Sequence, residues 1–185
     1  MISMESDEAR KVNKQIFKHI KEEAVEASLK LGSERGEAMD CMGTGMRNSH
    51  LMAVAPNASS SALVGSSPSI EPWKANVFLS EGRAGSVLIK NEYLENYLES
   101  IGKNNKLVWD NILRNEGSVQ QLEFIPQNVK DVFKTAMELN QLALINLGAE
   151  RTPYICQSQS LNIFIHNEMS AQELSDIHFQ AWVKG

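Results

Sequence analysis

The sequence predicts an α/β fold, and three observations support this prediction. Apolar residues recur at helical spacing in several stretches, as amphipathic helices require. Residues 50–55 form a nearly continuous apolar run that ends at Pro56, which is typical of a strand covered on both faces. Residues 160–165 alternate polar and apolar side chains through Phe164, as a half-buried strand does. Helices that alternate with buried strands favour an α/β arrangement.

The first element is a long amphipathic helix over residues 6–31, with apolar side chains on one stripe and Lys and Glu opposite. Ser6 is a suitable N-cap, because Asp7 and Glu8 then lie at the positive end of the helix dipole. Gly32 is a suitable stop signal. We expect residues 36–45 to form a loop.

The middle of the chain predicts a hairpin followed by two helices. Residues 77–79 and 87–89 are apolar runs separated by a turn that contains glycine. Asn91 is then expected to cap a helix that closes at Gly102. A second, short helix is expected over residues 107–113.

Two further helices are predicted in the last third of the sequence. One follows Pro126 and keeps a broad apolar stripe up to Gly148. The other opens at Ser170 with a capping-box sequence, and we expect its Phe179 and Trp182 to face the core. The sequence stops inside this helix without a C-cap, which predicts that residues 1–185 are an incomplete piece of a larger unit.

Composition and charge limit the classes of function. The chain has 185 residues, 42% of them hydrophobic and 22% charged, as in an ordinary globular domain. A formal net charge of -5 and the lack of a Lys/Arg run argue against a nucleic-acid partner. No stretch approaches the ~20 apolar residues of a membrane helix, and the N-terminus lacks a signal sequence. We therefore expect no membrane association and a cytoplasmic location.

Residues 56–61 are the strongest candidate for chemistry. They follow the predicted strand and contain one Asn, three Ser and no bulky side chain. Such a segment can bring several N–H groups and hydroxyls to an anion, at the end of a strand where α/β proteins bind ligands. Taken by spacing alone, a plain turn is the more common explanation of such a cluster.

Other reactive side chains give weaker signals. Cys41 and Cys156 are too few for a disulfide framework or a metal cluster, and we interpret both as structural or incidental thiols. The four histidines lack ligand spacing, so no metal site is expected. Glu71, next to Pro72, could brace the loop, but an exposed glutamate at a turn is the commoner case.

Several motifs, in the same order and at the same spacing, resemble the class I ribonucleotide reductase large subunit. The likeness runs essentially from end to end of the chain, and it is carried by residues 46–51, 56–61, 69–72, 115–120, 156–163 and 178–182. The resemblance implies that residues 1–185 are a single, incomplete segment from the C-terminal portion of a ten-stranded α/β barrel domain.

The resemblance also implies a substrate site. In the family, the loop that matches residues 56–61 holds the diphosphate of the ribonucleotide through backbone amides and hydroxyls, so the expected substrate-binding residues are Asn57, Ala58, Ser59, Ser60 and Ser61. The usual motif has Thr or Ser where this chain has Asn57. A backbone donor survives that change, whereas the side-chain contact does not follow from the likeness.

No catalytic residue is expected in this chain, because the family's radical cysteine, its redox cysteine pair and its tyrosine relay match no position here. The resemblance implies that the chain itself binds no cofactor. The family uses a metal-tyrosyl radical on the small subunit, and thioredoxin or glutaredoxin as reductant. The implied partners are a ribonucleoside diphosphate, the remaining N-terminal part of the large subunit and the small subunit.

Two alternatives to a reductase fragment remain at this point. The chain could be a non-catalytic nucleotide- or phosphate-binding module that folds alone. It could also be a degenerate remnant without a retained role. Against the first, an open piece of a barrel exposes strand edges and apolar faces that proteins normally cover.

Overall fold

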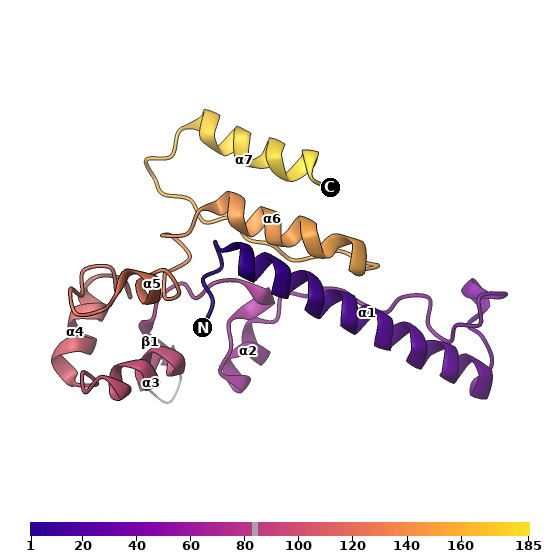
Figure 1. Cartoon of the computed structure of the whole chain (residues 1–185), viewed down its shortest axis with the longest axis horizontal. Coiled ribbons are helices and arrows are strands. Elements are labelled where there is room, and N and C mark those ends of the chain that lie inside the picture. Colours follow the sequence, from indigo (N-terminus) through magenta and orange to yellow (C-terminus); the bar gives the residue numbers. More distant parts are fainter. Residues whose placement is uncertain (83–84) are drawn as a thin grey trace.

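The computed structural model describes residues 1–82 and 85–185. Three helices lie one above another, with α6 between α1 and α7 (Figure 1): α1 (Asp7–Arg35), α6 (Gln141–Arg151) and α7 (Ala171–Val183). A second group of elements is built on a hairpin: β1 (Val77–Gly82), β2 (Gly85–Lys90), α3 (Glu92–Ser100), α4 (Lys106–Arg114) and α5 (Gln127–Lys130). The remaining elements are short: α2 (Ala58–Val64) and the 3-10 helices η1 (Met39–Cys41), η2 (Pro68–Ile70) and η3 (Thr152–Tyr154).

Helix α1 begins where the sequence predicts and ends later. The Ser6 side chain accepts a hydrogen bond from the amide of Ala9, which confirms the predicted N-cap. The helix continues through Gly32, so the predicted stop was wrong. A Cβ at Gly32 would lie 1.9 Å from the carbonyl oxygen of Gly45. Gly32 therefore gives room for the returning loop instead of ending the helix.

The hairpin and the two helices after it are confirmed. Strands β1 and β2 pair in antiparallel register from Val77 with Lys90 onward, and the Asn91 side chain caps α3 by accepting the amide of Tyr93. These elements surround the main hydrophobic core, which consists of Val77, Leu94, Leu98, Trp109, Ile112, Val119, Leu122, Ile125 and Phe133.

The single helix predicted between Pro126 and Gly148 was wrong. The segment forms the short helix α5, then irregular backbone, and then α6, which Asn140 caps. A tertiary contact and a local one hold the irregular part. The amide of Ala136 donates to the carbonyl of Trp73 at 2.8 Å, and the carboxylate of Glu138 accepts the nearby amide of Thr135 at 2.8 Å. The apolar residues that suggested a helix, among them Phe133, Ala136 and Leu139, are buried although the backbone between α5 and α6 is irregular.

The two predicted strands, residues 50–55 and 160–165, do not form a sheet. One parallel bridge joins Val54 of the first segment to Gln159, the residue just before the second segment. The amide of Val54 donates to the carbonyl of Ser158, and the amide of Ser160 donates to the carbonyl of Val54. In the described residues the only sheet is the β1–β2 hairpin. The described residues are thus mostly helical, with one small sheet.

Helix α7 has the predicted capping box at Ser170 and Glu173. The expectation that its aromatic residues face the core was wrong, since Phe179 is 56% and Trp182 74% exposed. Their rings contact each other, with centroids 5.6 Å apart. Among the described helices and strands, α7 packs mainly against α6. None of its described residues is buried.

Candidate functional site at the start of helix α2

The five residues predicted to bind phosphate form the start of α2. Asn57 is the N-cap, and Ala58, Ser59 and Ser60 make up the first turn. Amides in the first turn of a helix have no acceptor within the helix, so they can donate to an anion. The amide of Ser61 donates to the carbonyl of Asn57 at 2.9 Å, and the Ser61 side chain is buried. Ser59 and Ser60 are exposed and are best placed to contact a ligand.

The Asn57 side chain does not cap the helix that it begins. Its Oδ1 instead accepts the amide of Ser69 at 2.7 Å. This bond closes a loop between residues twelve positions apart in the sequence. The carboxamide oxygen is thus engaged inside the protein, while the backbone amide of Asn57 and its side-chain Nδ2 are the groups of this residue that can donate to an anion.

A left-handed turn forms the far end of this loop. Ser69 has φ 55° and Ile70 has φ 62°, values that non-glycine residues adopt rarely and β-branched residues least of all. The hydroxyl of buried Ser69 donates to the carbonyl of Ala55 at 3.0 Å, and the amide of Glu71 donates to the carbonyl of Pro68. The turn is therefore fixed to the extended segment that precedes α2.

Glu71 connects the same turn to the second extended segment. Its Oε1 accepts both the amide of Asn162 at 3.0 Å and the Asn162 side-chain Nδ2 at 2.7 Å. Only 4% of Glu71 is exposed, so the expectation of an exposed turn glutamate was wrong. The sequence suggested that Glu71 could brace the loop only as the less common alternative, and it did not single out Ser69 or Asn162 as parts of the site. The signal that could have found them is their position inside two of the resembling motifs.

The parallel bridge decides where this loop lies. Val54 pairs with Gln159, and the chain leaves the paired region through Pro56 before α2 begins. The first turn of α2 therefore follows the carboxyl end of an extended segment. In α/β proteins ligands are bound at this end of the strands.

A cleft of about 400 Å³ borders the C-terminal half of α2. Its walls include Trp73, Phe78 and Ile89, and two lysines line it, Lys74 and Lys90. Lys90 is already engaged by the carboxylate of Glu95 at 2.7 Å. Ser59 and Ser60 are not among the lining residues, so this cleft is separate from the exposed amides of the first turn.

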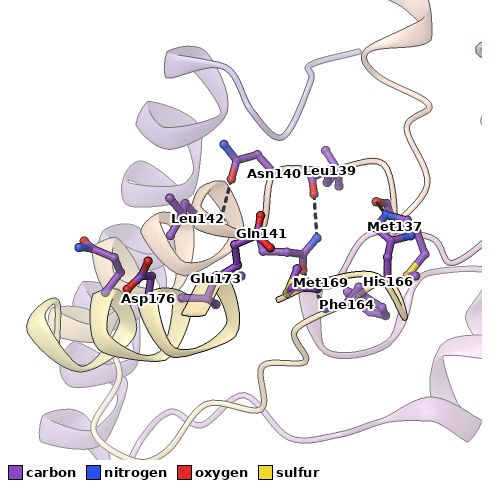
Figure 2. A pocket seen from close by; sticks show the side chains of 12 residues that line it. Met137, Leu139, Asn140, Gln141, Leu142, Phe164, His166, Met169, Glu173 and Asp176 are labelled. Atoms are coloured by element: carbon purple, nitrogen blue, oxygen red, sulfur yellow. Dashed lines mark hydrogen bonds between the residues drawn. The ribbon is translucent and has the colours of Figure 1, made fainter. Parts of the chain in front are cut away.

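A second cleft of about 400 Å³ lies between the start of α6 and helix α7 (Figure 2). Several of its polar groups are used inside the protein. Gln141 donates to the carbonyls of Ala136 and Leu139 and accepts the amide of Phe164, while Glu173 belongs to the capping box. The rest of the lining is largely apolar, which is typical of a packing surface more than of a catalytic site.

The two thiols differ in environment. Cys156 is exposed, and its sulfur accepts the amides of Leu51 at 3.0 Å and Met52 at 3.2 Å. The backbone hydrogen bonds from Met52 and then Leu51, with a smaller contribution from His50, lower the pKa of Cys156 below its usual value. Cys41 is half-buried and donates to the carbonyl of Met46. No pairing of the two thiols is present in the described residues.

Neither metal chemistry nor a membrane span is indicated by the residues that the structure describes. In residues 1–82 and 85–185, no three His, Cys, Asp or Glu side chains gather as ligands for a metal ion. Within the same ranges, no helix combines the length and apolar character needed to cross a bilayer.

Comparisons with known proteins place this geometry in a family. The family described as "Ribonucleotide reductase, barrel domain" matches residues 38–185. A putative ribonucleoside-diphosphate reductase large subunit of Frog virus 3 is 44% identical over 184 residues, which cover 100% of this chain and 33% of the relative. The large subunit of Invertebrate iridescent virus 6 is 44% identical over 190 residues, which cover 100% of this chain and 20% of the relative.

A solved structure is similar over nearly the whole chain. The class Id ribonucleotide reductase alpha subunit of Actinobacillus ureae superimposes with a TM-score of 0.90 at 38% identity, and the match covers 99% of this chain and 34% of that subunit. The chain thus spans about a third or less of the length of these relatives.

Proposed function

The chain belongs to the family of ribonucleotide reductase barrel domains, and we propose that it binds the substrate diphosphate in a ribonucleoside-diphosphate reductase large subunit. The proposed ligands are the amides of Asn57, Ala58, Ser59 and Ser60 and the hydroxyls of the exposed serines. Ser61 is the fifth residue of the proposed site, and its buried side chain lies inside the loop. Residues 1–185 are proposed to be a single, incomplete portion of the barrel.

One observation carries this proposal: the first turn of α2, whose amides have no acceptor within the helix, follows the paired extended segment directly, and Ser59 and Ser60 in this turn are exposed. A pyrophosphate group requires several N–H donors close together, and a helix start provides them at fixed spacing. Small side chains at Ser59 and Ser60 leave the approach to these donors open.

The partial charges at the helix start favour an anion. The first-turn amides carry partial positive charge, which favours phosphate oxygens over neutral ligands. Helix α2 has seven residues, so its contribution is mainly that of the individual N–H groups. We therefore propose a role in binding and orienting the substrate, with the bond-breaking groups supplied from elsewhere.

The extended segments are consistent with a chain that binds substrate while other parts of the subunit supply the reacting groups. Residues 52–54 pair with residues 157–160, and in the described chain neither segment has a second strand neighbour. We propose that further barrel strands from the remaining part of the large subunit pair with these segments. That part would also contribute the radical cysteine and the redox cysteines.

The other proposed partners follow from the family. The small subunit would supply the metal-tyrosyl radical, and thioredoxin or glutaredoxin would restore the reduced cysteine pair. No residue of this chain is proposed to hold the metal. A cytoplasmic location is proposed with the same partners.

A charge substitution tests the proposed binding site. Ser59→Glu places a carboxylate at the second residue of α2, where it favours the helix but repels phosphate. Leu107→Glu is the matched control, since Leu107 is also exposed and is the second residue of a helix with an asparagine N-cap. We expect Ser59→Glu to weaken binding of cytidine diphosphate more than about tenfold, and the control to change it less than about twofold. Equal effects of the two variants would contradict the assigned site.

An activity assay separates the reductase fragment from a stand-alone phosphate-binding module. The chain is mixed with the small subunit and with the remaining parts of a large subunit, including those that carry the radical cysteine, the redox cysteines and the tyrosine relay, and reduction of cytidine diphosphate is measured. Activity that depends on this chain supports the fragment. Tight nucleotide binding by the chain, without activity in any mixture, supports the module instead.

A further inference from the structure

We propose that Asn57 and Glu71 are positioning residues that fix the direction of the first turn of α2. This inference rests on the proposed function, because it concerns how the phosphate-binding amides are held. Two contacts carry it: the Asn57 carboxamide oxygen accepts the Ser69 amide, and the Glu71 carboxylate accepts two donors from Asn162.

The contact at Asn57 acts at the residue where the helix begins. The N-cap sets the direction in which a helix leaves the preceding chain, and its side chain usually bonds to the helix's own amides. Here the side chain bonds across the loop to Ser69 and leaves the first-turn amides free for an external acceptor. Asn57 therefore fixes the helix start without occupying the donors that a phosphate needs.

Ser69, which donates this hydrogen bond, has a backbone conformation that residues other than glycine rarely adopt. Ser69 and Ile70 are consecutive residues with positive φ, which persists in a β-branched residue only when the surroundings enforce it. The bonds from Ser69 to Asn57 and to Ala55 supply one constraint. The second constraint is at Glu71.

Glu71 fastens the turn to the neighbouring extended segment. Its carboxylate is buried, and the hydrogen bonds from Asn162 replace water that the charged group has lost. Asn162 lies three residues after Gln159, which forms the parallel bridge with Val54. The start of α2 is consequently tied to both extended segments.

The residue type at position 57 differs from the one in the resembling motif. The resembling motif has Thr or Ser at this position, with a shorter side chain. The longer carboxamide of Asn57 reaches Ser69 through its oxygen. Asn57 would thus influence binding of the diphosphate through the geometry of the helix start.

The test uses the 15N-labelled 185-residue chain, with amide exchange at Ser69 and chemical shifts at Ser59 and Ser60 during titration with cytidine diphosphate. Asn57→Ala is expected to speed exchange at Ser69 at least about fivefold and to weaken binding by a similar factor, as loss of one hydrogen bond implies. Asn57→Asp keeps the acceptor, so slow exchange at Ser69 should return. Asn115→Ala removes an exposed asparagine with a local bond and serves as the control.

Glu71 is tested by a second pair of variants. Glu71→Ala should speed exchange at both Ser69 and Asn162, whereas Glu71→Gln keeps an oxygen acceptor and should restore slow exchange at both. Restoration by the isosteric variant separates a specific hydrogen bond from a general need for volume at this position. Unchanged exchange at Ser69 in both Asn57→Ala and Glu71→Ala would overturn the inference.

The two proposals fail in different ways. If the wild-type chain shows no response to cytidine diphosphate at Ser59 and Ser60, the proposed function of the chain fails, while exchange at Ser69 still decides the positioning contact. If Asn57→Ala weakens binding but leaves exchange at Ser69 unchanged, Asn57 contacts the ligand directly and the positioning role is wrong.

Discussion

Asn76 and Asn91 share a buried side-chain hydrogen bond, in which Asn91 Nδ2 donates to Asn76 Oδ1 at 2.9 Å. They lie immediately before β1 and immediately after β2, and the amide of Asn91 also donates to the carbonyl of Asn76. Asn76 Nδ2 donates further to the carbonyls of Gly117 and Phe133. The pair therefore closes the base of the hairpin and fixes it to the helical core.

Asn76→Ala is expected to lower the free energy of unfolding by about 3 kcal/mol, because buried polar groups would be left without partners. Urea unfolding followed by circular dichroism measures this change. Gln172→Ala is the control, since that side chain is exposed and bonds locally to Asp176, and it should cost less than about 0.5 kcal/mol. A similar small loss for Asn76→Ala would show that the network contributes little.

Gly32 and Gly148 are both helical but should respond oppositely to alanine. In Gly32→Ala the new Cβ meets the Gly45 carbonyl at 1.9 Å, so we expect destabilisation by about 2 kcal/mol or more. In Gly148→Ala the atom nearest to the new Cβ is Leu161 Cδ2 at 3.5 Å, which is an ordinary contact. The higher helix propensity of alanine should therefore raise the free energy of unfolding by up to about 1 kcal/mol. Thermal unfolding of the two variants compares them directly, and equal midpoints would contradict the close approach of the loop.

Cys156 should be the more reactive thiol, because hydrogen bonds from Met52 and Leu51 favour its thiolate and lower its pKa. We expect iodoacetamide at pH 7.5 to modify Cys156 several times faster than half-buried Cys41. The variants Cys41→Ala and Cys156→Ala isolate each rate. The lowered pKa stabilises the folded state. This contribution is fully present above the pKa of the thiol in the unfolded chain, and it is lost as the pH falls through the pKa of the thiol in the folded chain. A reaction midpoint at or above 9.0 for Cys156 would contradict this assignment.

Trp182 should become buried if the proposed large subunit assembles around this chain. Trp182 is 74% exposed, whereas Trp109 is 4% exposed. With fluorine-labelled tryptophan, addition of the N-terminal part of a large subunit should move the Trp182 resonance and leave that of Trp109 in place. Trp182→Phe assigns the signal. An unchanged Trp182 signal in an active mixture would show that α7 stays open in the assembly.

Local signals in the sequence determined much of the secondary structure. Ser6, Asn91 and Ser170 cap helices as predicted, because a cap needs only a side-chain oxygen and amides two or three residues away. The hairpin follows from two apolar runs close together in the chain. The order of several motifs likewise identifies the family, since motif order is a property of the sequence alone.

Contacts between distant residues decided what the sequence could not. Gly32 continues a helix because Gly45 returns to it, and Glu71 is buried because Asn162, ninety-one residues later, supplies its donors. The same is true of Asn57, whose side chain serves Ser69 instead of its own helix. Composition and spacing fix which groups a segment offers, but burial and hydrogen-bond partners depend on what packs against it, and only the tertiary structure specifies that.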